Sequence, residues 1–213
     1  VNLACCLMQI GFWGMLGAFA GFQTAVLLDR GFTSGQAGIF IALGYLAGMA
    51  AQPLMGSWAD RHPEMPLKWL FGMCIVPALA LNFLFYFTRP GFWGTALIFL
   101  LLGATETNAY PLIDSMAMQY INAGMNISYS LGRGLGAFAY AVVCVVVGQQ
   151  TARFGVQTAL LFHGVLLVLM LAFTLYFPAF PKEALTPKAA RQAPHSALYL
   201  LQANKPFTLM LLG

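Results

Sequence analysis

Charged residues are scarce in this chain of 213 residues. It has 10 Lys and Arg and 6 Asp and Glu, so that 8% of its residues are charged, against roughly 25% in soluble domains. Hydrophobic residues make up 60% of the chain, and its mean hydropathy is +0.77. An aqueous fold of this length has too little interior to hide so much apolar surface. The composition therefore excludes a soluble domain and predicts a protein whose solvent is the lipid bilayer.

Paired cysteines and clustered basic residues are also missing. The four cysteines, Cys5, Cys6, Cys74 and Cys144, lie in apolar runs and lack the spacing of a zinc site or a disulfide framework. We interpret them as packing residues and predict no metal site. The net charge is +4, but the basic residues are scattered singly, and no basic stripe interleaved with aromatic residues is present. We therefore expect no nucleic-acid partner.

Long apolar runs dominate what remains. A membrane-spanning helix needs about 20 mainly apolar residues. Six segments meet this requirement, at approximately residues 1–28, 36–59, 69–87, 92–118, 131–150 and 156–177. The gaps between them are short and hold the turn-forming residues and most charges, which is typical of hairpins between antiparallel helices. The sequence thus predicts an all-α membrane protein with a six-helix transmembrane bundle at residues 1–179.

A more polar stretch with several prolines follows at residues 180–204 and is interpreted as a linker. Residues 205–213 turn apolar again and are interpreted as the truncated start of a seventh transmembrane helix. Basic residues set the expected orientation. Nine of the ten Lys and Arg lie outside the predicted spans, and six of these nine would be on the inside if the amino terminus is cytoplasmic. The positive-inside rule favours this arrangement, which places the linker in the cytoplasm.

Three ionisable side chains fall within predicted spans: Glu106, Asp114 and Arg133. A charge in hydrocarbon costs a few kcal/mol, so it persists where it is paired, hydrated or used in transport. Asp114 lies near the end of the fourth span and Arg133 near the start of the fifth. An antiparallel hairpin places them at similar depth and predicts an ion pair. Tyr140 lies seven residues after Arg133, on nearly the same helix face.

Glu106 lies eight residues before Asp114, at a depth close to that of Tyr140. No basic residue is expected at its depth, so Glu106 should face water or carry a proton. We predict that Glu106, Asp114, Arg133 and Tyr140 line one substrate cavity, and that Glu106 or Asp114 takes part in proton coupling. Two simpler readings stay open: Asp114 and Arg133 are a structural pair, and Glu106 makes a satisfied polar contact.

Glycines recur at spacings of three or four within the predicted spans, as at Gly44 and Gly48 and at Gly132 and Gly136. In lipid, this spacing lets two helix backbones approach closely. We expect these glycines to lie at contacts between helices. The single histidine of the sixth span, His163, is expected to be a packing or hydrogen-bonded residue.

The run from Gln52 to Arg61, QPLMGSWADR, resembles the signature loop of the major facilitator superfamily, in which a glycine, three residues, an aspartate and a basic residue follow the second helix. In this chain these positions are Gly56, Asp60 and Arg61. The resemblance implies that they form a gating loop that braces helix ends in one access state; a solvated loop is the alternative. It also implies that the chain is the amino-terminal half of a twelve-helix carrier, whose partner is the missing carboxy-terminal half bundle.

Within the superfamily, the chain is most similar to the lactose permease branch of oligosaccharide and proton symporters and to the nucleoside symporters. Pro111 with Asp114, and Arg133 with Gly136, fall where that branch has comparable residues. The resemblance implies that Asp114 and Arg133 bind a sugar and that Tyr140 stacks on its ring. Asp114 is shorter than the glutamate of lactose permease, and Tyr140 replaces a tryptophan.

These features predict a secondary active transporter, not an enzyme, that moves a sugar or similar polyhydroxylated solute with protons by alternating access. Its partners are the solute, protons and the lipid bilayer; no cofactor is expected, and the proton gradient supplies the energy. We expect a multi-pass protein of the plasma membrane, taken as a bacterial inner membrane. The alternatives are a drug or metabolite exporter of the same superfamily, and a membrane-embedded enzyme. For the enzyme, no serine or cysteine is evident as a partner for His163.

Overall fold

The computed structural model describes residues 1–180, and these residues form one helical unit. Helices α1 (Asn2–Phe19) and α2 (Gln23–Asp29) together make the first span. The prediction of one continuous helix over residues 1–28 is therefore wrong in detail. The Phe22 amide donates to the Phe19 carbonyl at 2.9 Å, a tight turn that separates the two helices around Gly21, a residue that disfavours helix interiors.

Each of the other five predicted spans corresponds to one helix: α3 (Ser34–Arg61), α4 (Leu67–Phe87), α5 (Phe92–Asn122), α6 (Tyr129–Phe154) and α7 (Thr158–Tyr176). All six spans are long and apolar enough to cross a membrane. Among residues 1–180 every regular element is a helix, so the fold class is all-α as predicted. The predicted linker at residues 180–204 and the predicted start of the seventh transmembrane helix at residues 205–213 lie, except for residue 180, outside the described residues.

Helix α3 is longer than the sequence predicted. It begins with a capping box, in which the Thr33 hydroxyl accepts from the Gln36 amide and the Gln36 side chain accepts from the Thr33 amide. It continues through Arg61. The residues predicted to form a gating loop, Gly56, Asp60 and Arg61, are therefore the last two turns of a helix.

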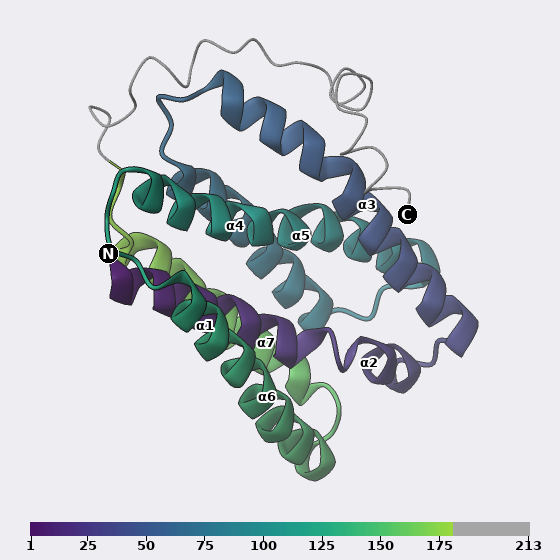
Figure 1. Ribbon diagram of the computed structural model, residues 1–213. Coiled ribbons are helices and arrows are strands. Elements are labelled where there is room, and N and C mark those ends of the chain that lie inside the picture. Colours follow the sequence, from purple (N-terminus) through teal and green to yellow (C-terminus); the bar gives the residue numbers. More distant parts are fainter. Residues whose placement is uncertain (181–213) are drawn as a thin grey trace, which may run out of the picture. The chain divides into compact units, whose positions relative to one another are not determined.

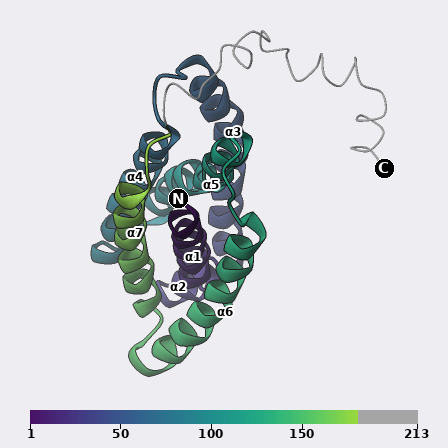
Figure 2. The ribbon, with the colours of Figure 1, turned by 60° about the vertical axis from the view of Figure 1, so that its left-hand side comes forward.

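The first span is the centre of the bundle, and Figure 2 shows α1 enclosed by the longer helices. About 67% of the most apolar stretch of the first span is buried, against 17% for α3 and for α6. α1 packs on α6 and α7, α5 packs on α3 and α4, and α4 also packs on α7. Helices α3 and α6 therefore turn most of their surface away from the bundle.

Glycines make the closest helix contacts, as the sequence predicted. A methyl group on Gly103 of α5 would overlap the backbone of Gly44 on α3, and one on Gly136 of α6 would overlap the Trp13 ring of α1. A methyl group on Gly17 would lie 2.9 Å from the Tyr140 carbonyl oxygen, closer than real side chains approach. Small residues thus bring α1 to α6 and α3 to α5, which are the helices that surround the cavity described below.

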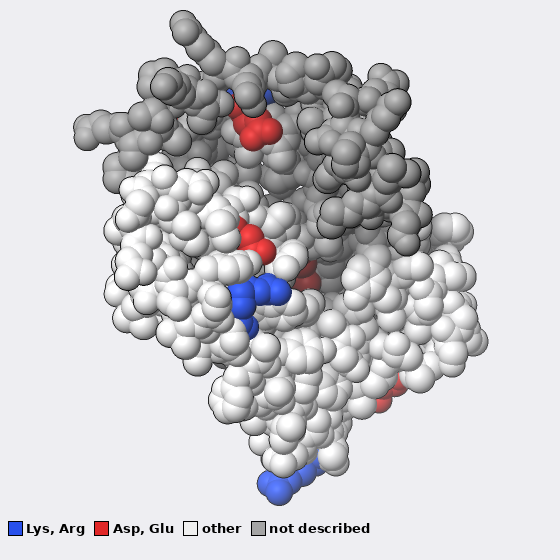
Figure 3. Space-filling view, in the orientation of Figure 1, with Lys and Arg blue, Asp and Glu red and all other residues white. Residues whose placement is uncertain are grey.

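Charged atoms are few on the face drawn in Figure 3. They gather around a central hollow and at the edges of the molecule, and the surface between them carries no charged side chains. A charged side chain is costly to place against an apolar medium, and this face has few of them.

Candidate functional site

A cavity of about 410 Å³ opens between the helices of the first, second, fourth and fifth spans. Residues of α1, α2, α3, α5 and α6 line it, whereas α4 and α7 contribute none and stand behind it. A pocket of a few hundred Å³ is large enough for a small organic molecule. The cavity is therefore the first candidate for a binding site.

Aromatic rings form a large part of the cavity wall. The ring-bearing residues are Phe12, Trp13, Phe19, Tyr45, Phe99, Tyr110 and Tyr140. Polar groups come from Gln23, Gln52, Thr107 and the tyrosine hydroxyls. Among the described residues that line the cavity, Glu106 is the one that carries a charge. The wall thus combines flat apolar faces with scattered hydrogen-bonding groups and a single acid.

Glu106 has a basic neighbour that the sequence analysis missed. Its Oε1 lies 3.3 Å from Nε2 of His163 on α7, so the expectation that no basic residue shares its depth is wrong. The side chain of Glu106 is 16% exposed and that of His163 is 1% exposed. A lone histidine in an apolar run gave no sequence signal for this pairing, because the contact joins residues of two different spans. Within residues 1–180, no three His, Cys, Asp or Glu side chains lie close enough together to hold a metal ion.

Asp114 and Arg133 do not form the predicted ion pair. No nitrogen of Arg133 lies within 4.0 Å of the Asp114 carboxylate. The carboxylate instead accepts a hydrogen bond of 3.0 Å from Gln9 Nε2 on α1, and Gln9 Oε1 accepts from Trp13 Nε1 at 3.0 Å. The central helix α1 supplies a neutral donor that replaces the expected guanidinium.

Arg133 rests on aromatic rings. Its guanidinium carbon lies 4.8 Å from the centre of the Trp13 ring and 5.4 Å from that of Tyr110, both within the range of cation–π attraction. Its Nη1 is buried and has no hydrogen-bond partner within the described structure. Trp13 and Tyr110 line the cavity, so Arg133 lies directly behind two of its wall residues. Neither Arg133 nor Asp114 lines the cavity itself.

Tyr140 lies where the sequence predicted, in the cavity wall on α6. Its ring meets the Trp13 ring edge to face, with centroids 6.4 Å apart. Trp13 thus touches Tyr140 and Arg133 and also donates to Gln9. Of the four predicted substrate residues, the structure places Glu106 and Tyr140 on the cavity and Asp114 and Arg133 one layer away from it.

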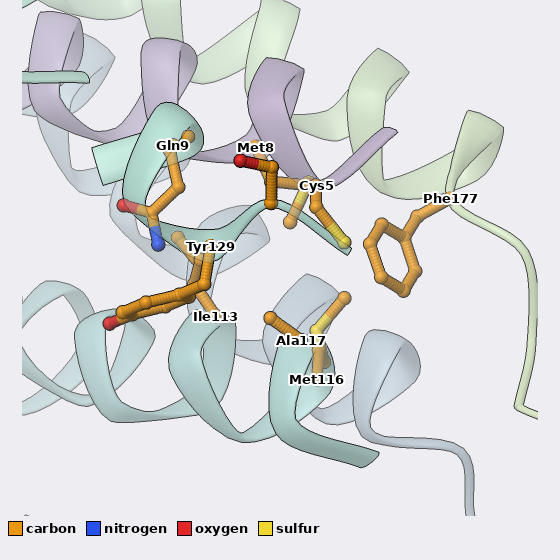
Figure 4. A pocket seen from close by; sticks show the side chains of 10 residues that line it. Cys5, Met8, Gln9, Ile113, Met116, Ala117, Tyr129 and Phe177 are labelled. Atoms are coloured by element: carbon orange, nitrogen blue, oxygen red, sulfur yellow. The ribbon is translucent and has the colours of Figure 1, made fainter. Parts of the chain in front are cut away.

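A second, much smaller pocket lies near the amino-terminal end of α1 (Figure 4). Its volume is about 10 Å³, which is room for little more than a water molecule. Cys5, Met8, Met116 and Phe177 make it apolar, and Gln9 and Tyr129 give it a polar end. We interpret it as a packing defect beside the Gln9 and Asp114 contact, too small for a solute.

Within residues 1–180, the predicted gating residues Gly56, Asp60 and Arg61 have no side-chain partner that would mark a gate. Asp60 and Arg61 are exposed at the end of α3 and make no side-chain hydrogen bond or ion pair within residues 1–180. A methyl group on Gly56 would meet nothing within 4 Å. Beside them, the ring of His62 stacks on Trp58 with centroids 4.3 Å apart. Their gating role stays a prediction.

Comparison with known proteins identifies the fold around this cavity. Residues 5–211 match the MFS_1 like family. The chain belongs to this family of major facilitator transporters. Among solved structures, it is similar to that described as "Crystal structure of nucleoside transporter NupG", with a TM-score of 0.78 and 18% identity. The likeness covers 99% of this chain and 52% of the other, so this chain spans about half its length. No curated protein sequence is significantly similar.

These matches confirm the prediction that the six-span bundle has the fold of the amino-terminal half of a major facilitator transporter. The six apolar helices and the family match also agree with a multi-pass membrane protein. At 18% identity the likeness concerns the fold alone, and the chemistry must come from the cavity.

Proposed function

We propose that this bundle forms one wall of a proton-coupled symporter for a sugar or a similar polyhydroxylated solute, with nucleosides included in that class. The observation that carries the proposal is the cavity wall, where a single acid, Glu106, stands among aromatic rings and neutral polar groups. A neutral solute suits a site with so little fixed charge. Its hydroxyls can form hydrogen bonds with side-chain amides and phenols, and its apolar face can stack on aromatic rings.

The aromatic wall supports recognition of a flat ligand face. Tyr140 and Trp13 present rings from two different helices at an interplanar angle of 75°. A pyranose or a ribose with an attached base offers one apolar face and several hydroxyl groups, and such a ligand gains from stacking as well as from hydrogen bonds. The structural likeness to a transporter described as a nucleoside transporter adds support for nucleosides alongside sugars.

Arg133 and Asp114 extend the proposed site beyond the cavity wall, next to Gln9 and Trp13 of α1. The unpartnered Nη1 of Arg133 is a strong donor held between Trp13 and Tyr110, two residues of the cavity wall. We propose that this donor binds a solute hydroxyl when one of the two rings moves aside. Because the guanidinium is not tied to Asp114, no ion pair has to break for Arg133 to bind.

Proton coupling is assigned to Glu106, with Asp114 as the second candidate. Glu106 lines the cavity and is half-buried beside His163, whereas Asp114 accepts a hydrogen bond from Gln9. The proton gradient across a plasma membrane, such as a bacterial inner membrane, would supply the energy, with the amino terminus in the cytoplasm. Transport requires a second bundle that forms the other wall, and rocking of the two bundles exposes the site alternately.

The test is uptake into proteoliposomes that hold the full-length protein, with the interior more alkaline than the outside. We expect accumulation of a labelled sugar or nucleoside that a protonophore abolishes. Glu106→Gln should abolish accumulation but keep exchange of solute across the membrane, since exchange needs no net proton movement. Accumulation that survives a protonophore would refute proton coupling.

An exporter of lipophilic cations is the second candidate. One acid surrounded by aromatic rings is also what a delocalised cation prefers, since rings attract cations by their faces. Competition separates the two functions. Sugars and nucleosides should displace the labelled solute and cationic dyes should not; displacement by dyes alone would favour the exporter.

A further inference from the structure

We propose that Glu106 and His163 form a single proton-binding site, in which one proton is held between Glu106 Oε1 and His163 Nε2 and is exchanged with the cavity through Glu106. The pairing of these two residues, and the path by which the proton reaches them, go beyond the general proton coupling proposed above. Only the use of this proton for transport rests on the proposed function; the site itself does not.

Asn82 of α4 fixes which nitrogen of His163 carries a hydrogen. Its Nδ2 donates to the Leu160 carbonyl at 3.1 Å, and a carbonyl oxygen can only accept. The amide oxygen of Asn82 therefore points at His163, where Oδ1 lies 2.9 Å from Nδ1. Because this oxygen is also an acceptor, Nδ1 must be the donor. The other nitrogen, Nε2, is then free to accept a proton.

Nε2 faces an atom that is also an acceptor when ionised. The Glu106 Oε1 lies 3.3 Å away, and both atoms are buried with no other hydrogen-bond partner within the described structure. Two bare lone pairs facing each other in a buried place lose hydration and gain nothing. One proton between them turns the same contact into a hydrogen bond. The geometry thus calls for one proton more than the Nδ1 hydrogen.

The surroundings give the site one entrance. The Phe19 ring stacks on the His163 ring with centroids 4.7 Å apart, and His163 is 1% exposed. Glu106 reaches the cavity. A proton that arrives through the cavity therefore meets the carboxyl first and the imidazole second.

No other acid or base among the described residues competes for this proton. The titratable groups that share the cavity with Glu106 are the phenols of Tyr45 on α3, Tyr110 on α5 and Tyr140 on α6. α1 and α2 face it with Phe19 and Gln23, and α4 contributes Asn82 through His163. The guanidinium of Arg133, behind the cavity wall, rests on Trp13 and Tyr110.

Gly164 leaves the room that Asn82 needs. A methyl group at Gly164 would lie 2.9 Å from Asn82 Nδ2, so a side chain there would push the amide that orients His163. Gly164→Ala is therefore a variant that disturbs the tautomer without touching either proton-binding atom.

The experiment is a proton count on the full-length protein in detergent, without solute or membrane gradient. Acid–base titration is followed with a pH indicator and by the infrared band of the protonated carboxyl. We expect Glu106→Gln to release one proton fewer than the parent protein, because the glutamine amide can donate to Nε2 permanently. His163→Gln should keep the proton but move its release to another pH. The double variant should release as many protons as Glu106→Gln alone, because both residues share one proton.

Asp114→Asn is the matched control, since it neutralises the other acid of α5. It should leave the shift in release pH caused by His163→Gln unchanged. An unchanged proton count in Glu106→Gln, or an unchanged release pH in His163→Gln, would overturn the proposal. Failure of this titration leaves symport standing, and failure of gradient-driven uptake leaves the proton site standing, so the two proposals are tested separately.

Discussion

The side-chain amide of Gln9 joins the Asp114 carboxylate on one side and the Trp13 indole on the other, each through a hydrogen bond of 3.0 Å. The middle of α1 is thereby tied to α5 at the edge of the cavity. An isolated carboxylate at this position would be costly in the membrane, and the amide offsets that cost without a second charge.

Replacing Gln9 by alanine should destabilise the bundle. The change removes the hydrogen bonds that Gln9 makes to the Asp114 carboxylate and the Trp13 N–H. A fully buried polar group left unsatisfied costs roughly 1–3 kcal/mol, and these two groups are half-buried, so we expect a loss of about 1 kcal/mol or more. Thermal unfolding of the full-length protein in detergent measures the effect. Gln149→Ala is the control, because Gln149 is exposed on α6 and its side chain makes no hydrogen bond to another residue of the described part of the chain. Equal stability of the two variants would contradict the role of Gln9.

Replacing Arg133 by glutamine should weaken solute binding by about tenfold or more, since a cation–π contact and a charged donor together are worth about 1–2 kcal/mol. The bundle should still insert and fold. Binding is measured by how far the solute protects a cysteine from labelling, or by equilibrium dialysis.

The same variant tests the relation of Arg133 to Asp114. Because the two side chains form no ion pair, Asp114→Asn should not rescue Arg133→Gln, and their effects on solute binding should add. Rescue by the second substitution would show that the charges are coupled in a state other than the one described here.

Replacing Gly103 by alanine should separate α3 from α5. Its methyl group has no room against the Gly44 backbone, and overpacking of this kind costs about 1–3 kcal/mol, with more when backbone must move. The matched control is Gly38→Ala on α3, where nothing lies within 4 Å and alanine favours a helix by up to ~1 kcal/mol. Opposite shifts of the unfolding temperature are expected, and a neutral Gly103→Ala would refute the close approach.

Replacing Arg30 by alanine should loosen the end of the bundle opposite the amino terminus. Arg30 Nη1 donates to the Thr88 carbonyl at 2.8 Å, and Nη2 donates to Gln157 Oε1 at 2.9 Å, so one side chain joins the ends of three spans. Its guanidinium carbon also lies 3.8 Å from the centre of the Phe85 ring. Loss of these bonds should lower the free energy of unfolding by about 2 kcal/mol.

This effect should not depend on pH near neutrality. Burial and, less strongly, the neighbouring Arg89 lower the pKa of Arg30, but a guanidinium stays charged at any physiological pH. Arg153→Ala is the control, since Arg153 is exposed at the end of α6. Unfolding in detergent at two pH values checks both expectations, and a pH-dependent loss in Arg30→Ala would count against the assignment.

Sequence patterns were sufficient for the spans and for the glycine contacts. Each span is predicted by its length and apolar composition. Glycines at a contact between helices recur at a spacing of three or four residues, as Gly44 and Gly48 do. The break between α1 and α2 was missed because the apolar run continues through it. Hydropathy indicates whether a segment prefers lipid or water, but it does not indicate where a helix breaks within that segment.

Partner choice inside the bundle was not predictable in the same way. Reasoning from depth brought Asp114 to Arg133 and left Glu106 alone, whereas the structure pairs Asp114 with Gln9 and Glu106 with His163. Depth along two neighbouring helices gives one coordinate of a side chain. The rotation of each helix and the identity of its other neighbours give the rest, and Gln9 and His163 come from spans that are distant in sequence.

The amino-acid sequence by itself therefore determined the solvent, the number of spans and the membership of a transporter superfamily, because each follows from local composition or a contiguous motif. Only the tertiary structure decided which wall residues share the cavity, that Arg133 rests on rings rather than on a carboxylate, and that one acid meets one imidazole there. The physical reason is that a side-chain contact across a helix bundle depends on helix rotation and crossing, which no single segment of the chain encodes.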